Sequence, residues 1–146
     1  MVSNGPTFSP KGDRLYFSDS LAGRILVYAL DPASGKLGVA TEFHRFAAED
    51  GFPDGLTVDS AGHVWCALYG GGKVVRFDAD GKRQEEIALP VPNVTSCCLG
   101  GPQLKTLYVT TGQTADKPPT DLGGALFARE VAVPGLAEPL FAPANR

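Results

Sequence analysis

The sequence has few cysteines and no long apolar run, and each of these absences excludes a class of protein. Its three cysteines, Cys66, Cys97 and Cys98, show no CxxC or Cys/His spacing of a zinc site, and their odd number favours a reducing, cytoplasmic location. No apolar stretch approaches the roughly 18 residues that a membrane-spanning helix needs, and the first residues lack a basic segment followed by an apolar one. We therefore expect a cytoplasmic protein with no membrane partner.

A surplus of basic residues is also lacking. Thirteen Lys and Arg residues stand against sixteen Asp and Glu residues, which gives a formal net charge of -3. No Lys/Arg run interleaved with aromatic residues is present to follow a phosphate backbone, so we expect no nucleic-acid partner. With 146 residues, 43% of them hydrophobic and 20% charged, the chain has the composition of a folded domain.

Helical periodicity is hard to find, and a repeating strand pattern takes its place. Eighteen glycines and twelve prolines divide the chain into short segments, many of which alternate apolar and polar residues. An apolar-aromatic triplet recurs at Leu15-Tyr16-Phe17, Val64-Trp65-Cys66 and Leu107-Tyr108-Val109. A period of roughly 40 to 50 residues with four strands in each unit is typical of β-propeller blades. We therefore predict an all-β fold with about three blades, over residues 1–50, 51–92 and 93–146.

Three blades are too few to close a propeller, which usually needs roughly four to eight. An open ring would leave the faces of its end blades without a partner. We therefore expect a partial propeller that is completed either by a missing N-terminal half or by a second copy in a homodimer.

Two polar residues recur at one place in this pattern. Asn4 in Ser3-Asn4-Gly5 and Asp54 in Pro53-Asp54-Gly55 each precede the predicted first, innermost strand of a blade, and Thr95-Ser96 stands at a similar distance from the third triplet. When repeats surround a common axis, their equivalent positions lie close to that axis. The side-chain oxygens at these three positions therefore predict a cation site at the mouth of the propeller's central channel. Asn-Gly and Asp-Gly are also common turn dipeptides, and a purely structural interpretation stays open.

The candidate ligands suit a hard divalent cation. Carboxylate and carboxamide oxygens are preferred by Ca²⁺, Mg²⁺ and Mn²⁺, whereas Zn²⁺ is less natural without His or Cys. One Asp and one Asn neutralise only part of a 2+ charge, so a further carboxylate has to come from elsewhere.

The remaining polar and aromatic residues of the repeats receive structural roles. Aspartates recur at strand ends, where their side chains cap turns through hydrogen bonds to the backbone. Three large aromatic residues share one repeat position, which favours packing between blades. Two histidines stand where acid-base chemistry is not expected. The residues concerned are Asp31, Asp59 and Asp78; Tyr16, Trp65 and Tyr108; and His44 and His63.

The ordered motifs of the chain resemble the senescence marker protein, regucalcin and gluconolactonase family, and in particular its C-terminal half. The residues that carry the resemblance are Ser3-Asn4-Gly5, Leu15 to Ser20, Pro53-Asp54-Gly55, Thr95-Ser96-Cys97 and Leu107 to Thr110. The resemblance implies a six-bladed propeller that hydrolyses sugar lactones or related esters with one divalent cation. It further implies that Asn4 and Asp54 are metal ligands and that Asp54 is the catalytic proton acceptor and donor. The family's third ligand, a Glu, and its substrate-holding Arg and Asn belong to the N-terminal half and have no counterpart here.

The sequence therefore supports two hypotheses. In the first, the chain is an incomplete half of a divalent-metal-dependent hydrolase that acts on a small lactone or ester. In the second, it is a non-catalytic propeller fragment that serves as a cation-binding or interaction module. The sequence does not decide whether the chain is an enzyme by itself.

Overall fold

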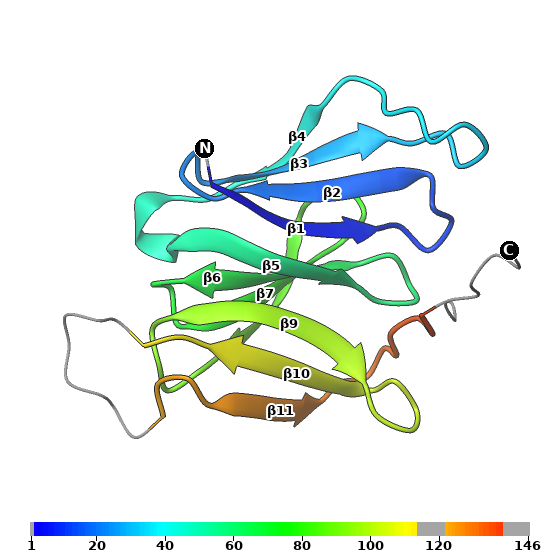
Figure 1. Cartoon of the computed structure of the whole chain (residues 1–146). Helices are drawn as coiled ribbons and strands as arrows, with labels where there is room; N and C mark the ends of the chain where they lie inside the picture. Colours follow the sequence, from blue (N-terminus) through cyan, green and yellow to red (C-terminus); the bar gives the residue numbers. More distant parts are fainter. Residues whose placement is uncertain (1, 114–121, 139–146) are drawn as a thin grey trace, which may run out of the picture.

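The computed structural model of the chain describes residues 2–113 and 122–138, and it consists of three antiparallel sheets that lie one above another (Figure 1). The first sheet has the order β1 (Ser3–Phe8), β2 (Arg14–Asp19), β3 (Arg24–Ala29) and β4 (Thr41–Arg45). The second has the order β5 (Phe52–Val58), β6 (Val64–Tyr69), β7 (Lys73–Phe77) and β8 (Arg83–Ala88). The third contains β9 (Val94–Gly100), β10 (Thr106–Thr111) and β11 (Leu126–Glu130), with β10 in the middle.

The first strands of the three sheets lie side by side. β5 contacts β1 on one side and β9 on the other, and the later strands of each sheet extend away from this row (Figure 1). This is the arrangement of the innermost strands of propeller blades. A single 3-10 turn, η1 (Ala48–Asp50), joins the first sheet to the second, and the described residues contain no α-helix. The all-β prediction is therefore confirmed.

The predicted start of the first strands was wrong. Asn4 and Asp54 were expected ahead of the innermost strands, but they lie inside β1 and β5. The reason is cross-strand pairing, since Ser3 and Asn4 pair with Asp19 and Ser18, and Phe52 and Pro53 pair with Tyr69 and Leu68. Residues 114–121 and 139–146 of the third predicted blade lie outside the described residues.

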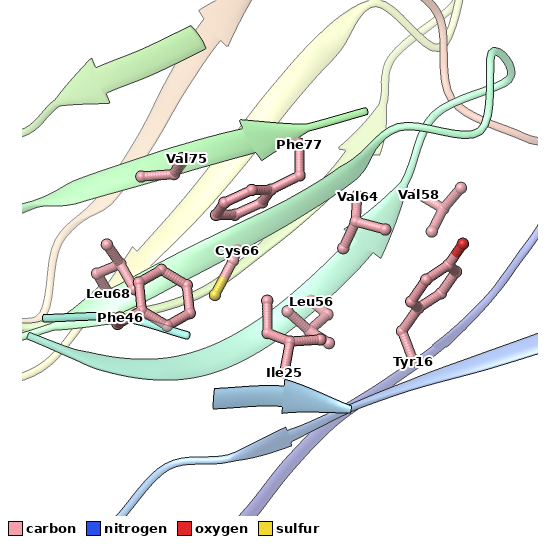
Figure 2. Packing of buried hydrophobic residues seen from close by; sticks show 10 residues of the cluster. All are labelled: Tyr16, Ile25, Phe46, Leu56, Val58, Val64, Cys66, Leu68, Val75 and Phe77. Atoms are coloured by element: carbon pink, nitrogen blue, oxygen red, sulfur yellow. The ribbon is translucent and has the colours of Figure 1, made fainter. Parts of the chain in front are cut away.

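The core lies between the sheets and forms two clusters. Between the first and second sheets, Tyr16, Ile25 and Phe46 pack against Val64, Cys66 and Phe77 (Figure 2). Between the second and third sheets, Trp65 and Val74 pack against Val94, Leu107 and Val109. Burying each such side chain contributes roughly 1.5 to 3 kcal/mol.

The central strands of the middle sheet, β6 and β7, are largely buried on both faces. Successive residues of β6 point to opposite faces, so Val64 and Cys66 enter one cluster while Trp65 and Ala67 enter the other. This explains why β6 is a continuous apolar run instead of an alternating one.

The shared aromatic position behaves as predicted in the first two blades. Tyr16 and Trp65 are each 1% exposed and pack against the following sheet. Tyr108 is only partly buried, because it lies on the opposite face of β10 from Leu107 and Val109 and no described sheet covers that face.

In the described part of the chain, no helix has the length and apolar character needed to cross a bilayer.

Candidate metal and catalytic site

Each innermost strand carries an irregularity at the candidate site. The pairing register of β1 with β2 shifts between Asn4 and Thr7, and that of β5 with β6 shifts between Pro53 and Leu56. Gly5 within the first of these has a φ of 81°, a conformation that favours glycine. Bulges of this kind re-aim side chains and are frequent beside active sites. The Asn-Gly and Asp-Gly dipeptides therefore belong to bulges inside strands and not to hairpin turns.

The third innermost strand has the corresponding irregularity at Thr95. Val94 and Ser96 pair with consecutive residues of β10, Thr111 and Thr110, and leave Thr95 between them. The Thr95 hydroxyl lies 2.8 Å from that of Thr110. Ser96 lies against Gly55, where a Cβ atom would overlap the Ser96 side chain. Ser96 thus packs beside the candidate site, and Gly55 allows β5 and β9 to approach closely.

Two serine hydroxyls from the first blade join the strand of Asn4 to the strand of Asp54. Asn4 Nδ2 donates a hydrogen bond to Ser20 Oγ at 3.0 Å, and Ser20 Oγ donates one to the carbonyl oxygen of Pro53 at 2.6 Å. Ser18 Oγ donates to the carbonyl oxygen of Asp54 at 2.8 Å. The structure therefore brings the two sequence-predicted ligand segments together. Two successive hydrogen bonds link the Asn4 side-chain amide to the backbone that precedes Asp54.

The side-chain oxygen atoms of both candidate ligands have no partner among the residues that the structure describes. Within residues 2–113 and 122–138, no hydrogen-bond donor contacts Asn4 Oδ1 and no donor or basic group contacts the Asp54 carboxylate. Burial raises the pKa of the Asp54 carboxyl group above its usual value. The carboxylate is half-buried and its oxygens still reach solvent, so a bound cation could approach them and supply a positive charge that the described residues do not.

The residues present fit part of a hard-cation site. They offer one carboxamide and one carboxylate oxygen, which suit Ca²⁺, Mg²⁺ or Mn²⁺. The described residues contain no group of three or more His, Cys, Asp or Glu that could hold a metal ion, so further ligands would have to come from elsewhere. Cys66 is a poor zinc ligand, because burial raises the pKa of its thiol well above the usual value and keeps it protonated.

Sequence reasoning missed Ser18 and Ser20 as parts of the site. Both belong to the Leu15 to Ser20 motif that carries the family resemblance, but their contacts cross from one blade to the next. The sequence carries no signal for these contacts, because they depend on how neighbouring blades are placed.

The turn-capping role of the recurring aspartates is confirmed. Asp31 accepts a hydrogen bond from the backbone N–H of Ala33, and Asp78 accepts from those of Asp80 and Lys82. Asp59 caps the β5–β6 turn in the same way.

Asp59 does more than cap a turn. Its carboxylate is fully buried and also accepts hydrogen bonds from Trp65 Nε1 at 3.1 Å and Arg76 Nε at 2.9 Å. This network belongs to the core between the second and third sheets. It lies at the opposite end of β5 from Asp54, so it is separate from the candidate site.

The fold and the unpartnered oxygens at its innermost strands define a β-propeller segment with a candidate cation site. A family model described as the SMP-30/gluconolactonase/LRE-like region matches residues 1–113. Pentonolactonase XacC of Haloferax volcanii is 39% identical over 145 residues, which cover 94% of this chain and 50% of that protein. The 6-deoxy-6-sulfogluconolactonase of Pseudomonas putida is 42% identical over 150 residues, covering 97% of this chain and 50% of that protein.

A solved structure supports the same assignment. The calcium-binding protein regucalcin of Agrobacterium tumefaciens superimposes with a TM-score of 0.87 at 30% identity, covering 97% of this chain and 50% of that one. The chain belongs to the SMP-30/gluconolactonase/LRE-like family, as its motifs predicted. The prediction of a partial β-propeller is likewise confirmed, and the chain spans about half the length of the curated relatives it matches.

Proposed function

We propose that this chain provides half of a site that hydrolyses sugar lactones or related esters with the help of a divalent cation. The observation that carries the proposal is the pair of unpartnered oxygen ligands, Asn4 Oδ1 and the Asp54 carboxylate, on adjacent innermost strands. The proposal is supported by two relatives of similar sequence that are named lactonases and by a similar structure described as calcium-binding. The remaining ligands and the substrate-holding groups would come from outside the described residues.

The chemistry assigned to this chain lies mainly with Asp54. A bound cation would polarise the lactone carbonyl as a Lewis acid. Asp54 accepts a proton from the attacking water while the oxygen of that water bonds to the carbonyl carbon. Asp54 then returns the proton to the ring oxygen as the C–O bond breaks, which yields a hydroxy acid. Burial raises the pKa of the Asp54 carboxyl in the cation-free chain, and a bound cation would lower it and favour the ionised form that accepts the proton.

Asn4 has a different part in the proposed site. Its carboxamide oxygen is a neutral ligand, so it holds the cation without reducing its charge. This leaves the cation more effective at polarising the carbonyl than a third carboxylate would.

A non-catalytic role is the second candidate, and the donor set favours it. The candidate site supplies only two ligand side chains for a cation, and the chain spans about half the length of its relatives. An interaction module would need no complete catalytic site, and a cation-binding module would need further ligands but no substrate-holding groups. We also propose a cytoplasmic location, which is supported by the three cysteines being free thiols.

Replacement of Asp54 tests the proposed reaction. Asp54→Ala should lower cation-dependent hydrolysis of an aldonolactone by at least about 100-fold, measured by acid release with Mn²⁺ or Ca²⁺ present. Asp80→Ala removes an exposed carboxylate from the β7–β8 turn and serves as the matched control. Unchanged turnover of the Asp54 variant would reject its role. Cation binding without hydrolysis by the wild-type chain would favour the module.

A further inference from the structure

We infer that Ser20 is a positioning residue, whose hydroxyl fixes the Asn4 carboxamide so that its oxygen, and not its nitrogen, is free to bind the cation. This inference rests on the proposed function and adds to it a residue from the β2–β3 turn. The same hydroxyl holds the two ligand strands of neighbouring blades in a fixed relation.

The direction of the hydrogen bonds follows from the donor count. A serine hydroxyl has one proton, and the Pro53 carbonyl oxygen can only accept. The proton of Ser20 is therefore committed to Pro53 at 2.6 Å. Ser20 Oγ has only lone pairs left for Asn4, so the group that approaches it at 3.0 Å has to be the NH₂ of the carboxamide. Oδ1 then points away from Ser20.

The surroundings of Ser20 keep this arrangement in place. Ser20 is 5% exposed, so water has little access to compete for its hydroxyl. Its backbone N–H donates to the carbonyl oxygen of Val2, and its carbonyl oxygen accepts from the N–H of Gly23, both at 3.0 Å. These bonds hold the residue from both sides.

Asn4 needs such a partner in a way that Asp54 does not. The two ends of a carboxamide have nearly the same shape, so in the cation-free chain an unrestrained Asn turns its NH₂ into the site about as often as its oxygen. A carboxylate offers oxygen in either orientation. A hydroxyl that accepts a hydrogen bond from the Asn4 NH₂ therefore increases the fraction of the protein whose site is ready to bind the cation. The apparent affinity rises in proportion to that fraction.

The serines also fix the backbone beside Asp54. Ser20 donates to the carbonyl oxygen of Pro53, and Ser18 donates to that of Asp54. Two consecutive carbonyl groups of β5 are thus bound by hydroxyls of the first blade. Only Ser20 contacts a candidate ligand side chain, which makes Ser18 a suitable comparison.

Cation affinity in three variants tests the inference. Ser20→Ala should weaken Mn²⁺ binding to the chain by about twofold or more in calorimetric titration, while Ser20→Thr, which keeps the hydroxyl, should bind Mn²⁺ with the affinity of the wild type. Ser18→Ala removes another buried hydroxyl and another bond between the same blades. Ser18→Ala should lower the melting temperature about as much as Ser20→Ala does, but it should weaken Mn²⁺ binding less. Equal losses in the two alanine variants, or wild-type affinity in Ser20→Ala, would overturn the inference.

A second measurement needs no metal. In ¹H–¹⁵N spectra of the labelled chain, the Asn4 side-chain protons should exchange slowly with water and show a nuclear Overhauser effect to Ser20. Both features should be lost in Ser20→Ala and kept in Ser20→Thr. If the wild-type chain binds no cation, the proposed metal site fails for this chain, and the amide spectra still decide the role of Ser20. Equal exchange of the Asn4 amide in wild type and Ser20→Ala would refute it.

Discussion

At the scale of single residues, Asp54 lies in an environment that opposes its own charge. Burial disfavours the ionised form and raises the pKa of the carboxyl above its usual 3.8. A carboxyl group whose pKa is higher in the folded than in the unfolded chain stabilises the fold at pH values below its unfolded-state pKa. This stabilisation is lost as the pH rises through the folded-state pKa. The ionised Asp54 therefore destabilises the cation-free chain at neutral pH.

Asp54→Asn should therefore make the chain more stable while it removes cation binding. We expect the melting temperature to rise by about 1 to 3 °C at neutral pH in a chelator, with the difference disappearing as the carboxyl becomes protonated in acid. Differential scanning calorimetry over a pH series measures this. Asp80→Asn, at an exposed position, is the control. A lower melting temperature for the Asp54 variant at neutral pH would contradict the argument.

At the scale of structural elements, the buried carboxylate of Asp59 connects the β5–β6 turn with β6 and β7. It accepts from the backbone of His63, from the Trp65 indole in β6 and from Arg76 in β7. Removing it would leave the Arg76 guanidinium and the indole N–H without their partner.

Asp59→Ala should destabilise the chain by about 3 to 5 kcal/mol, measured by urea unfolding. Asp78→Ala gives the matched control, because Asp78 caps the β7–β8 turn through the same backbone contacts but is only partly buried. We expect a clearly smaller loss for this control. Similar losses for both would show that Asp59 acts only as a turn cap.

The elements also show what sequence reasoning could reach. The strands and their grouping into blades were predictable, because alternation and glycine-containing turns are local signals. The bulges at Asn4 and Asp54 were not, since a bulge is defined by the partner strand, and the pattern alone placed both residues ahead of their strands. The contacts of Ser18 and Ser20 with β5 were also out of reach, because they depend on how one blade is rotated against the next.

At the scale of the whole molecule, the two end sheets each leave an apolar face uncovered by any described sheet. On the first sheet, Phe8 is 51% exposed and lies on the opposite face from Tyr16. On the third, Leu126 is 64% exposed and shares its face with Tyr108. Such faces favour association, either with a second copy of the chain or with a missing half of the ring.

We therefore expect the isolated chain to self-associate at about tens of micromolar in sedimentation velocity, and Leu126→Lys to shift it towards monomer. Val39→Lys is the control, because Val39 is also exposed but lies in the β3–β4 connection. A wild-type chain that stays monomeric throughout would contradict the prediction. A complex formed only with the remaining half of a relative would assign the faces to that half.

The hydrogen bonds of Ser20 also bear on how such a chain can change during evolution. Asn4 and Asp54 lie far apart along the chain, yet the relation between them is set by one hydrogen bond within the first blade and one across the boundary to the second. The connection between β3 and β4 leads through exposed residues around Gly35, where a side chain would meet no neighbouring atom. Insertions and deletions there can accumulate without altering the ligand geometry. Gaps in alignments of this outer segment therefore carry little information on whether a relative has kept the site.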